Sequence, residues 1–188
     1  MGARFGFGFV EVSAFGVAVG VSASAVNAVG LPTARFAGYL LNSGWLWASV
    51  AVAAGWWTGT RGRGAVAGPL ALLATTGAYY ATDSVVRGES MTSYWYEMRV
   101  WFVASIVVGS VLGIVGASAR RPGLWGLLAR LAVPVGAAVE MVWLPRWDHR
   151  FGLDPALDLA RILVWVASAL CMVVLARTTL ERRTEGTR

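Results

Sequence analysis

Residues 100–118 read VWFVASIVVGSVLGIVGAS and carry no charged side chain. In a helix, about twenty such residues rise about 30 Å, which is the thickness of the hydrocarbon core of a bilayer. Glu97 precedes the stretch, and the turn-forming sequence Arg-Arg-Pro-Gly follows it at 120–123. An apolar run that ends in charges and turn residues is typical of a membrane-spanning helix, so we predict one over residues 97–118.

Further apolar stretches of similar length fill the rest of the chain, which is 57% hydrophobic and 14% charged. They cover residues 8–29, 37–58, 65–86, 124–144 and 157–177. The sequence therefore predicts an all-α integral membrane bundle of six transmembrane helices.

The domain organisation follows from these spans. We expect one membrane domain over residues 1–178 and a short charged cytoplasmic tail over residues 179–188. The first apolar stretch begins almost at Met1 and lacks a clear small-residue cleavage site. We therefore interpret it as a retained helix and not as a signal peptide.

Composition argues against several classes of site. Cys171 is the single cysteine, so no disulfide can form within the chain, and we expect a buried, inert thiol in the last span. His149 is the single histidine, and no cluster of soft ligands accompanies it, so we expect no metal and no cofactor. The sequence also lacks a Walker-type phosphate loop and the GxSxG, HExxH and DDxxD motifs.

All sixteen basic residues are arginine, and the net charge is +6. The arginines are spread over several loops and helix ends, so membrane topology explains them better than nucleic-acid binding does. Nine of them fall on the side of the predicted termini and six on the opposite side. The positive-inside rule then places both termini in the cytoplasm. The absence of lysine and the abundance of Ala, Gly and Val indicate a GC-rich bacterial genome, and hence a multi-pass protein of the bacterial plasma membrane.

Small residues recur along one face of two predicted spans. Gly16, Gly20 and Ser24 follow each other at four-residue spacing, and Gly109 and Gly113 do the same in the fourth span. Such faces let helix backbones approach closely in lipid. Packing within the bundle is the first interpretation, and a docking face for a homo-oligomer or another protein is the alternative.

Polar side chains gather at one end of the predicted bundle when the spans run in alternating directions. The group comprises Asn27, Asn42, Asp83, Glu97, Glu140, Asp148, His149, Asp154 and Asp158. Ionisable side chains close to hydrocarbon are costly, so they indicate a functional site by default. For Asp154, which precedes Pro155, we favour a simpler role as the cap of the last helix.

Aromatic residues accompany the carboxyl groups at this end. Asp83 lies one helical turn from Tyr79 and Tyr80. The other aromatic and amide residues of this end are Asn42, Trp47, Tyr94, Trp95, Trp101 and Trp143. A belt of rings at the membrane interface would explain them, and so would a ligand site. Their coincidence with three carboxyl groups favours the site.

Glu140 lies in the sequence AAVEMVW, without another charge before Arg146. An apolar setting disfavours the charged form of a carboxyl group, and a neutral carboxylic acid can donate a proton. The alternative is an ion pair with Arg99 or Arg146 that only fixes the bundle.

An acid, aromatic faces and a dry cavity are what cation-olefin chemistry requires. The sequence Leu41-Asn42-Ser43-Gly44 with Trp47, the pair Tyr79-Tyr80 and an acid late in the fifth span resemble small bacterial membrane terpene cyclases. These are the drimentine-type enzymes of indole and cyclodipeptide terpenoid pathways.

The resemblance implies protonation-initiated cyclisation of a lipophilic, prenylated substrate, of the farnesylated indole or diketopiperazine type, without a metal. It makes Glu140, Asp83 and Glu97 the candidates for the acid and the final base. The candidate substrate-binding residues are Tyr79, Tyr80, Asn42, Trp47, Tyr94, Trp95, Trp101 and Trp143.

A second hypothesis is the substrate-capture subunit of a vitamin transporter. Such subunits are also six-helix proteins of about this size, with a small-residue face on the first helix and a ligand site at the outer end. The dominance of aromatic residues argues against a site for a polar vitamin. A third hypothesis is a membrane scaffold without chemistry. In each case membrane lipid is a partner and nucleic acid is not.

Overall fold

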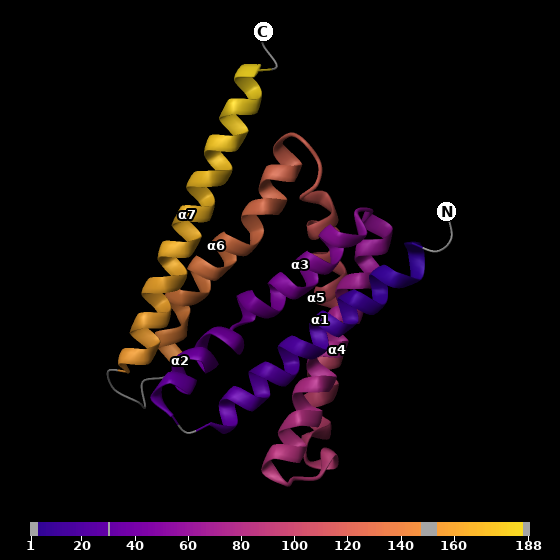
Figure 1. The fold of residues 1–188 in the computed structure, drawn as a ribbon, viewed down its shortest axis with the longest axis vertical. Coiled ribbons are helices and arrows are strands. Elements are labelled where there is room, and N and C mark those ends of the chain that lie inside the picture. The colour runs from indigo at the N-terminus through magenta and orange to yellow at the C-terminus, as the bar shows by residue number, and fades with distance from the viewer. Residues whose placement is uncertain (1–3, 30, 148–153, 186–188) are drawn as a thin grey trace.

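The computed structural model describes residues 4–29, 31–147 and 154–185 (Figure 1). These residues form seven α-helices and one short 3₁₀ helix. In chain order they are α1 (Arg4–Ala28), α2 (Pro32–Leu41), α3 (Gly44–Thr58), α4 (Arg61–Arg87), η1 (Met91–Tyr94), α5 (Trp95–Ser118), α6 (Leu124–Trp147) and α7 (Pro155–Glu185).

The predicted all-α class is confirmed for the described part of the chain. Four stretches are long and apolar enough to cross a membrane. They are Gly8–Ala28, Met91–Ser118, Leu124–Trp143 and Pro155–Thr179. The second and third of the six predicted spans do not meet these criteria, each for its own physical reason.

The second predicted span, 37–58, is broken into two helices. Helix α2 ends at Leu41, and Ser43 adopts an extended backbone with φ −74° and ψ 144° before α3 begins at Gly44. The 15 residues of α3 rise about 22 Å, which is less than the hydrocarbon thickness of about 30 Å. The prediction of one continuous helix here was wrong.

The third predicted span corresponds to α4, which is long enough but is rich in Gly, Ala and Thr. Helix α4 is central and packs against α1, α3 and α5. Thr75 and Thr76 are fully buried on it, and their hydroxyl groups bond to Ala71 O at 2.8 Å and to the Ser105 hydroxyl at 3.3 Å. A helix that is covered by its neighbours does not need the apolar surface that lipid contact demands, which explains its low hydropathy.

The small-residue faces bring the central helices together. A methyl group on Gly113 of α5 would overlap the carbonyl group of Gly64 on α4, and one on Gly55 of α3 would overlap that of Gly113. Gly16 and Gly20 of α1 press in the same way on the backbone of α4. These glycine faces are therefore covered within one chain.

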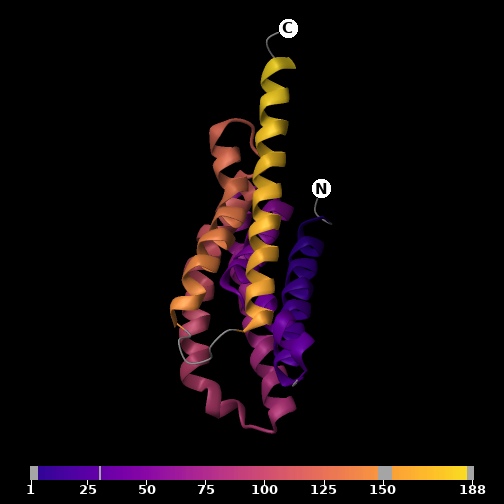
Figure 2. The ribbon, with the colours of Figure 1, turned by 90° about the vertical axis from the view of Figure 1, so that its left-hand side faces the viewer.

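Helices α6 and α7 pack side by side along one flank of the molecule (Figures 1 and 2). They join the other helices through contacts of α6 with α3 and α5, and of α7 with α2. The start of α1 and the end of α7 point toward the same end of the molecule (Figure 1). Helix α7 continues to Glu185, into the stretch that the sequence assigned to a charged tail.

Asp154 caps α7, as predicted. Its Oδ1 accepts a hydrogen bond from the backbone N–H of Ala156 at 3.0 Å. Its Oδ2 accepts from Arg35 at 2.6 Å and from the Tyr39 hydroxyl at 2.7 Å, which ties α2 to the start of α7. The hydrogen bond from Tyr39, the Ala156 N–H and the charge of Arg35 hold the pKa of Asp154 below its usual value, against the effect of its burial.

Candidate functional site

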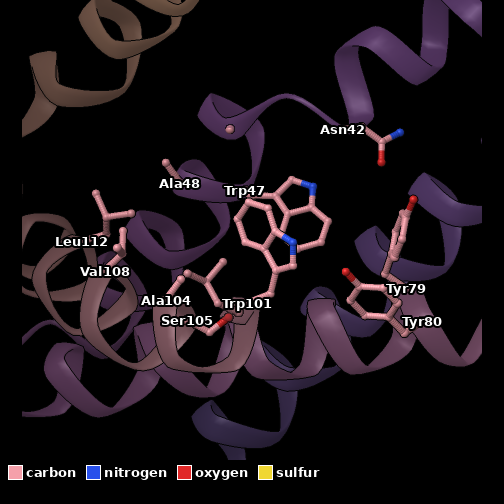
Figure 3. A pocket seen from close by; sticks show the side chains of 12 residues that line it. Asn42, Trp47, Ala48, Tyr79, Tyr80, Trp101, Ala104, Ser105, Val108 and Leu112 are labelled. Atoms are coloured by element: carbon pink, nitrogen blue, oxygen red, sulfur yellow. The ribbon is translucent and has the colours of Figure 1, made fainter. Parts of the chain in front are cut away.

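A pocket of about 400 Å³ lies between α3, α4 and α5, at the end of the bundle where the sequence gathers its carboxyl groups. Figure 3 shows the two indole rings of Trp47 and Trp101 at its centre. It is lined by Asn42, Gly44, Trp47, Ala48, Leu72, Tyr79, Tyr80, Trp101, Ala104, Ser105, Val108 and Leu112. Its walls are mostly aromatic and aliphatic, as in sites for lipophilic small molecules.

Five aromatic rings form a connected series along this pocket. Trp47 lies 6.5 Å from Trp101 and 5.9 Å from Tyr79, edge to face, measured between ring centroids. Tyr79 continues to Tyr80 at 5.3 Å, and Tyr80 to Tyr94 at 5.4 Å. The rings come from α3, α4, η1 and α5, so tertiary packing assembles a set that is scattered in the sequence.

Hydrogen bonds fix the orientation of two of these rings, Trp47 and Tyr79. The indole Nε1 of Trp47 donates to the Leu41 carbonyl at 3.0 Å, which ties the first turn of α3 to the end of α2. Tyr79 accepts from Asn27 Nδ2 at 3.2 Å. In Figure 3 the Tyr79 hydroxyl lies on the side of Asn42, and the Tyr80 hydroxyl turns toward the tryptophan rings. The indole N–H of Trp47 is thus occupied, and its ring face is what it offers to a ligand.

Asn42 stands at the break between α2 and α3. Its Nδ2 donates to Asn27 Oδ1 at 3.1 Å and to the Gly38 carbonyl at 3.1 Å. Together with the bond from Asn27 to Tyr79, these contacts link α1, α2 and α4. The amide side chain therefore stabilises the break and forms part of the pocket wall.

Glu140 of α6 caps α3. Its Oε1 accepts from the Gly44 N–H and its Oε2 from the Trp45 N–H, both at 2.7 Å. The first N–H groups of a helix lack partners within the helix, and its N-terminus favours a negative charge. Both oxygens of Glu140 therefore act as acceptors for the first N–H groups of α3.

Neither sequence-based interpretation of Glu140 anticipated this role. Arg99, one proposed partner, lies instead over the rings of Trp95 and Tyr96, at 5.7 and 5.9 Å from their centroids. The side chain of Arg146, the other proposed partner, lies outside the described residues.

The other two carboxyl candidates also lie away from the pocket lining. Asp83 is buried, and its Oδ1 accepts from the Ser24 hydroxyl at 3.3 Å and from Arg87 Nε at 3.0 Å. Glu97 is exposed in the first turn of α5. No carboxyl group is found among the described residues that line the pocket.

The eight candidate binding residues divide into three groups. Those that line the pocket are Asn42, Trp47, Tyr79, Tyr80 and Trp101. Tyr94 joins them through its contact with Tyr80. Trp95 and Trp143 are 57% and 55% exposed and do not line it, which fits the interpretation as an interfacial belt.

The aliphatic part of the wall was not predicted from the sequence. Ala104, Val108 and Leu112 follow Trp101 on one face of α5, and Ser105 lies beside them. Their spacing of three to four residues is the helical signal that could have identified them.

A second hollow of about 390 Å³ adjoins the break between α2 and α3. It is lined by Val26, Asn27, Val29, Ala34, Arg35, Gly38, Tyr39, Asn42 and Tyr79. Asn42 and Tyr79 belong to both linings, so the two hollows share a wall.

The described part of the chain includes Cys171 and most of the potential metal ligands. No group of three or more potential metal ligands occurs among its residues, and His149 lies outside them. Cys171 is exposed on α7, so the expected burial of its thiol was wrong.

Comparison of the chain with protein-family models, curated proteins and solved structures finds no match. The function must therefore be inferred from the geometry of the pocket itself.

Proposed function

We propose that this protein is a membrane protein that binds a lipophilic, prenyl-type molecule in the pocket between α3, α4 and α5. The observation that carries the proposal is a space of about 400 Å³ walled by Trp47, Trp101, Tyr79, Tyr80 and aliphatic side chains. This volume falls in the range of small-molecule sites, about 300–1,000 Å³. Burial of an apolar chain against such walls is driven by the hydrophobic effect and by dispersion.

In the membrane arrangement that we propose, all six predicted segments cross the bilayer. Helices α2 and α3 form one discontinuous crossing, and α4 crosses as the central helix. Irregular backbone at membrane depth is tolerated where it is buried in protein or lines a cavity, and Asn42 and Gly44 line both the break and the pocket. The arginine distribution then places both termini in the cytoplasm of a bacterial cell.

Cyclisation of the bound prenyl chain is the reaction that this pocket could serve. Four aromatic residues line the space, and the face of an aromatic ring can stabilise a carbocation. Glu140 binds the N–H of Gly44, which lines the pocket. A neutral Glu140 side chain would carry one O–H donor and keep acceptor capacity on its oxygens, and it could protonate an alkene. The Glu140 carboxylate that remains would take a proton from the cyclised cation, which regenerates the acid and completes an isomerisation in which substrate and product have equal mass.

The transporter-subunit hypothesis rests on two features, the small-residue face of the first helix and the outward position of the polar cluster. Gly16 and Gly20 of that face are buried against α4 within this chain. The pocket walls also offer few groups for a polar vitamin.

Binding can be tested with a farnesyl chain that carries a photoreactive diazirine, added to the purified protein in nanodiscs. We expect crosslinks on α3, α4 and α5 around the pocket. Trp101→Ala should weaken competition by unlabelled ligand about tenfold, which corresponds to about 1.4 kcal/mol. Trp125→Ala is the matched control, since Trp125 is 73% exposed on α6 and does not line the pocket. Equal losses in the two variants would contradict the proposal.

Catalysis can be tested by incubating the protein with a farnesylated indole diketopiperazine and searching for a product of unchanged mass. Glu140→Gln should abolish turnover, and Asp83→Asn and Glu97→Gln compare the other two carboxyl groups. Full activity of Glu140→Gln would remove Glu140 from the role of acid.

A further inference from the structure

We infer that the ligand is amphipathic, with its apolar chain in the aromatic pocket and an uncharged, hydrogen-bonding head in the second hollow. This inference rests on the proposed function and specifies its ligand. Asn42 and Tyr79 form the wall that the two hollows share. A molecule that reaches this wall from the apolar side meets polar atoms there.

The shared wall presents a donor and an acceptor. The Tyr79 oxygen accepts from Asn27, which leaves its own O–H to donate. The Asn42 amide donates through Nδ2 to Asn27 and Gly38, which leaves its carbonyl Oδ1 to accept. An amide or hydroxyl head can both accept from Tyr79 and donate to Asn42, so it matches this wall. A hydrocarbon end would leave these groups without ligand partners.

The charge in the second hollow favours a neutral head. Arg35 is the one charged side chain among the described residues that line it, and its Nη2 lies 2.6 Å from Asp154 Oδ2. Tyr39 donates to the same oxygen atom. The charge of Arg35 is thus balanced within the protein. A diphosphate group would need several cationic or backbone donors, and this lining supplies one paired arginine.

The polarity of the second hollow favours a head at the boundary with water. The exposed side chains Asn27, Arg35 and Asn42 of the second hollow are polar, whereas Trp101 and Val108, which are exposed in the first pocket, are not. A ligand in this orientation keeps its polar head near the membrane surface and its chain among the helices, which avoids burial of unpaired polar groups.

The test compares three probes with related chains. N-farnesylacetamide carries a neutral amide head, farnesyl diphosphate an anionic head, and farnesene no polar head. Their dissociation constants are measured by competition with the photoreactive farnesyl probe, in nanodiscs, for the wild type and for Tyr79→Phe. The ratio between the two proteins is used for each probe, because partition of a probe into lipid is the same for both and cancels.

We expect Tyr79→Phe to weaken the amide probe about five- to tenfold and to leave farnesene unchanged. The wild type should prefer the amide probe to the diphosphate. The matched control is Tyr96→Phe, which removes the same hydroxyl from a residue that is 73% exposed and lines neither hollow.

The outcomes separate this inference from the proposed function. Equal ratios for all three probes, with binding that still depends on Trp101, would overturn the neutral head and leave the pocket in place. Tightest binding of the diphosphate would also overturn it. Binding of no probe, or binding that is indifferent to Trp101, would overturn the proposed function itself.

Discussion

Helices α3, α4 and α5 meet in two regions that differ in one property, the volume of the side chains between them. Toward the end of α3 and the start of α4, Gly55, Gly64 and Gly113 bring the three backbones into contact. Toward the start of α3 and the end of α4, Trp47 and Tyr79 stand between the helices instead, and a pocket of about 400 Å³ remains.

This difference shows how one bundle can provide both stability and a site. In lipid, helices associate through close packing and polar contacts, because lipid tails are as apolar as the helices themselves. The glycine region supplies that packing. The aromatic region can then stay open, with Trp47 and Tyr79 held in place by hydrogen bonds.

The largest expected effect comes from breaking the glycine region. Gly113→Leu should lower the free energy of unfolding by about 3 kcal/mol or more, because even a methyl group there would overlap Gly64. Thermal unfolding in detergent measures this. Gly77→Leu is the matched control, since no other part of the protein lies within 4 Å of a methyl group there. Equal destabilisation by both variants would show that the close approach is not what stabilises the bundle.

The next largest effect is expected at the break between α2 and α3, which adjoins the aromatic region. Glu140→Ala should cost about 2 kcal/mol, because two N–H groups at the start of α3 lose a charged acceptor. Amide hydrogen exchange should accelerate at Gly44 and Trp45. Glu97→Ala, at an exposed position, should cost less than about 1 kcal/mol. If Glu140→Ala abolishes turnover but changes neither stability nor exchange, its role is that of an acid and not of a cap.

A third substitution fills the pocket of the aromatic region with a larger side chain, so that little space remains between the helices, as in the glycine region. Ala104→Phe places a ring in the pocket, so it should weaken binding of the farnesyl probe at least tenfold, or about 1.4 kcal/mol. The unfolding temperature should change little, because the space is already open. Val107→Phe, on the exposed face of α5, should leave binding unaltered. Undiminished binding to Ala104→Phe would place the ligand elsewhere.

The smallest effect lies outside both regions, where Asp154 joins α2 to α7. Its pKa is lowered from the usual 3.8, first by the hydrogen bond from Tyr39. A carboxyl group whose pKa is lowered in the folded protein stabilises the fold at pH values above its pKa in the unfolded chain. This contribution is lost as the pH falls through its pKa in the folded protein. Asp154→Asn should therefore be slightly less stable than the wild type at pH 7 and should lose less stability below about pH 4. Parallel pH profiles of the two proteins would contradict this.

Much of the architecture could be predicted from local patterns. The helix boundaries at residues 120–123 follow from turn chemistry, and the cap formed by Asp154 before Pro155 was recognised from two adjacent residues. Alternation of helix direction also predicted that Asn42, Tyr79 and Trp101 lie near one end of the bundle, and the structure brings them to one pocket. Asn-Ser-Gly at 42–44 carried the turn signal for the break in the second span, but the apolar residues around it favoured a continuous helix.

The roles of the carboxyl groups could not be predicted in this way. Glu140 binds backbone groups 95 and 96 residues away, and nothing in its own neighbourhood of the sequence indicates that contact. Asp83 had a visible partner in Arg87, one turn on, but its contact with Ser24 spans 59 residues. A carboxyl group among apolar residues has the same local sequence whether it donates a proton or caps another helix.

The sequence by itself determined that the chain is helical, that it is largely apolar, and that one end gathers a group of carboxyl, amide and aromatic side chains. Helical periodicity and turn chemistry act over a few residues, so these properties depend on residues that are close together in the sequence. Only the tertiary structure decided that Glu140 holds the start of α3, that the glycine faces are covered within one chain, and that five of the candidate residues line one pocket. These depend on how closely helices approach and in what register, which is set by the packing of side chains distant in sequence.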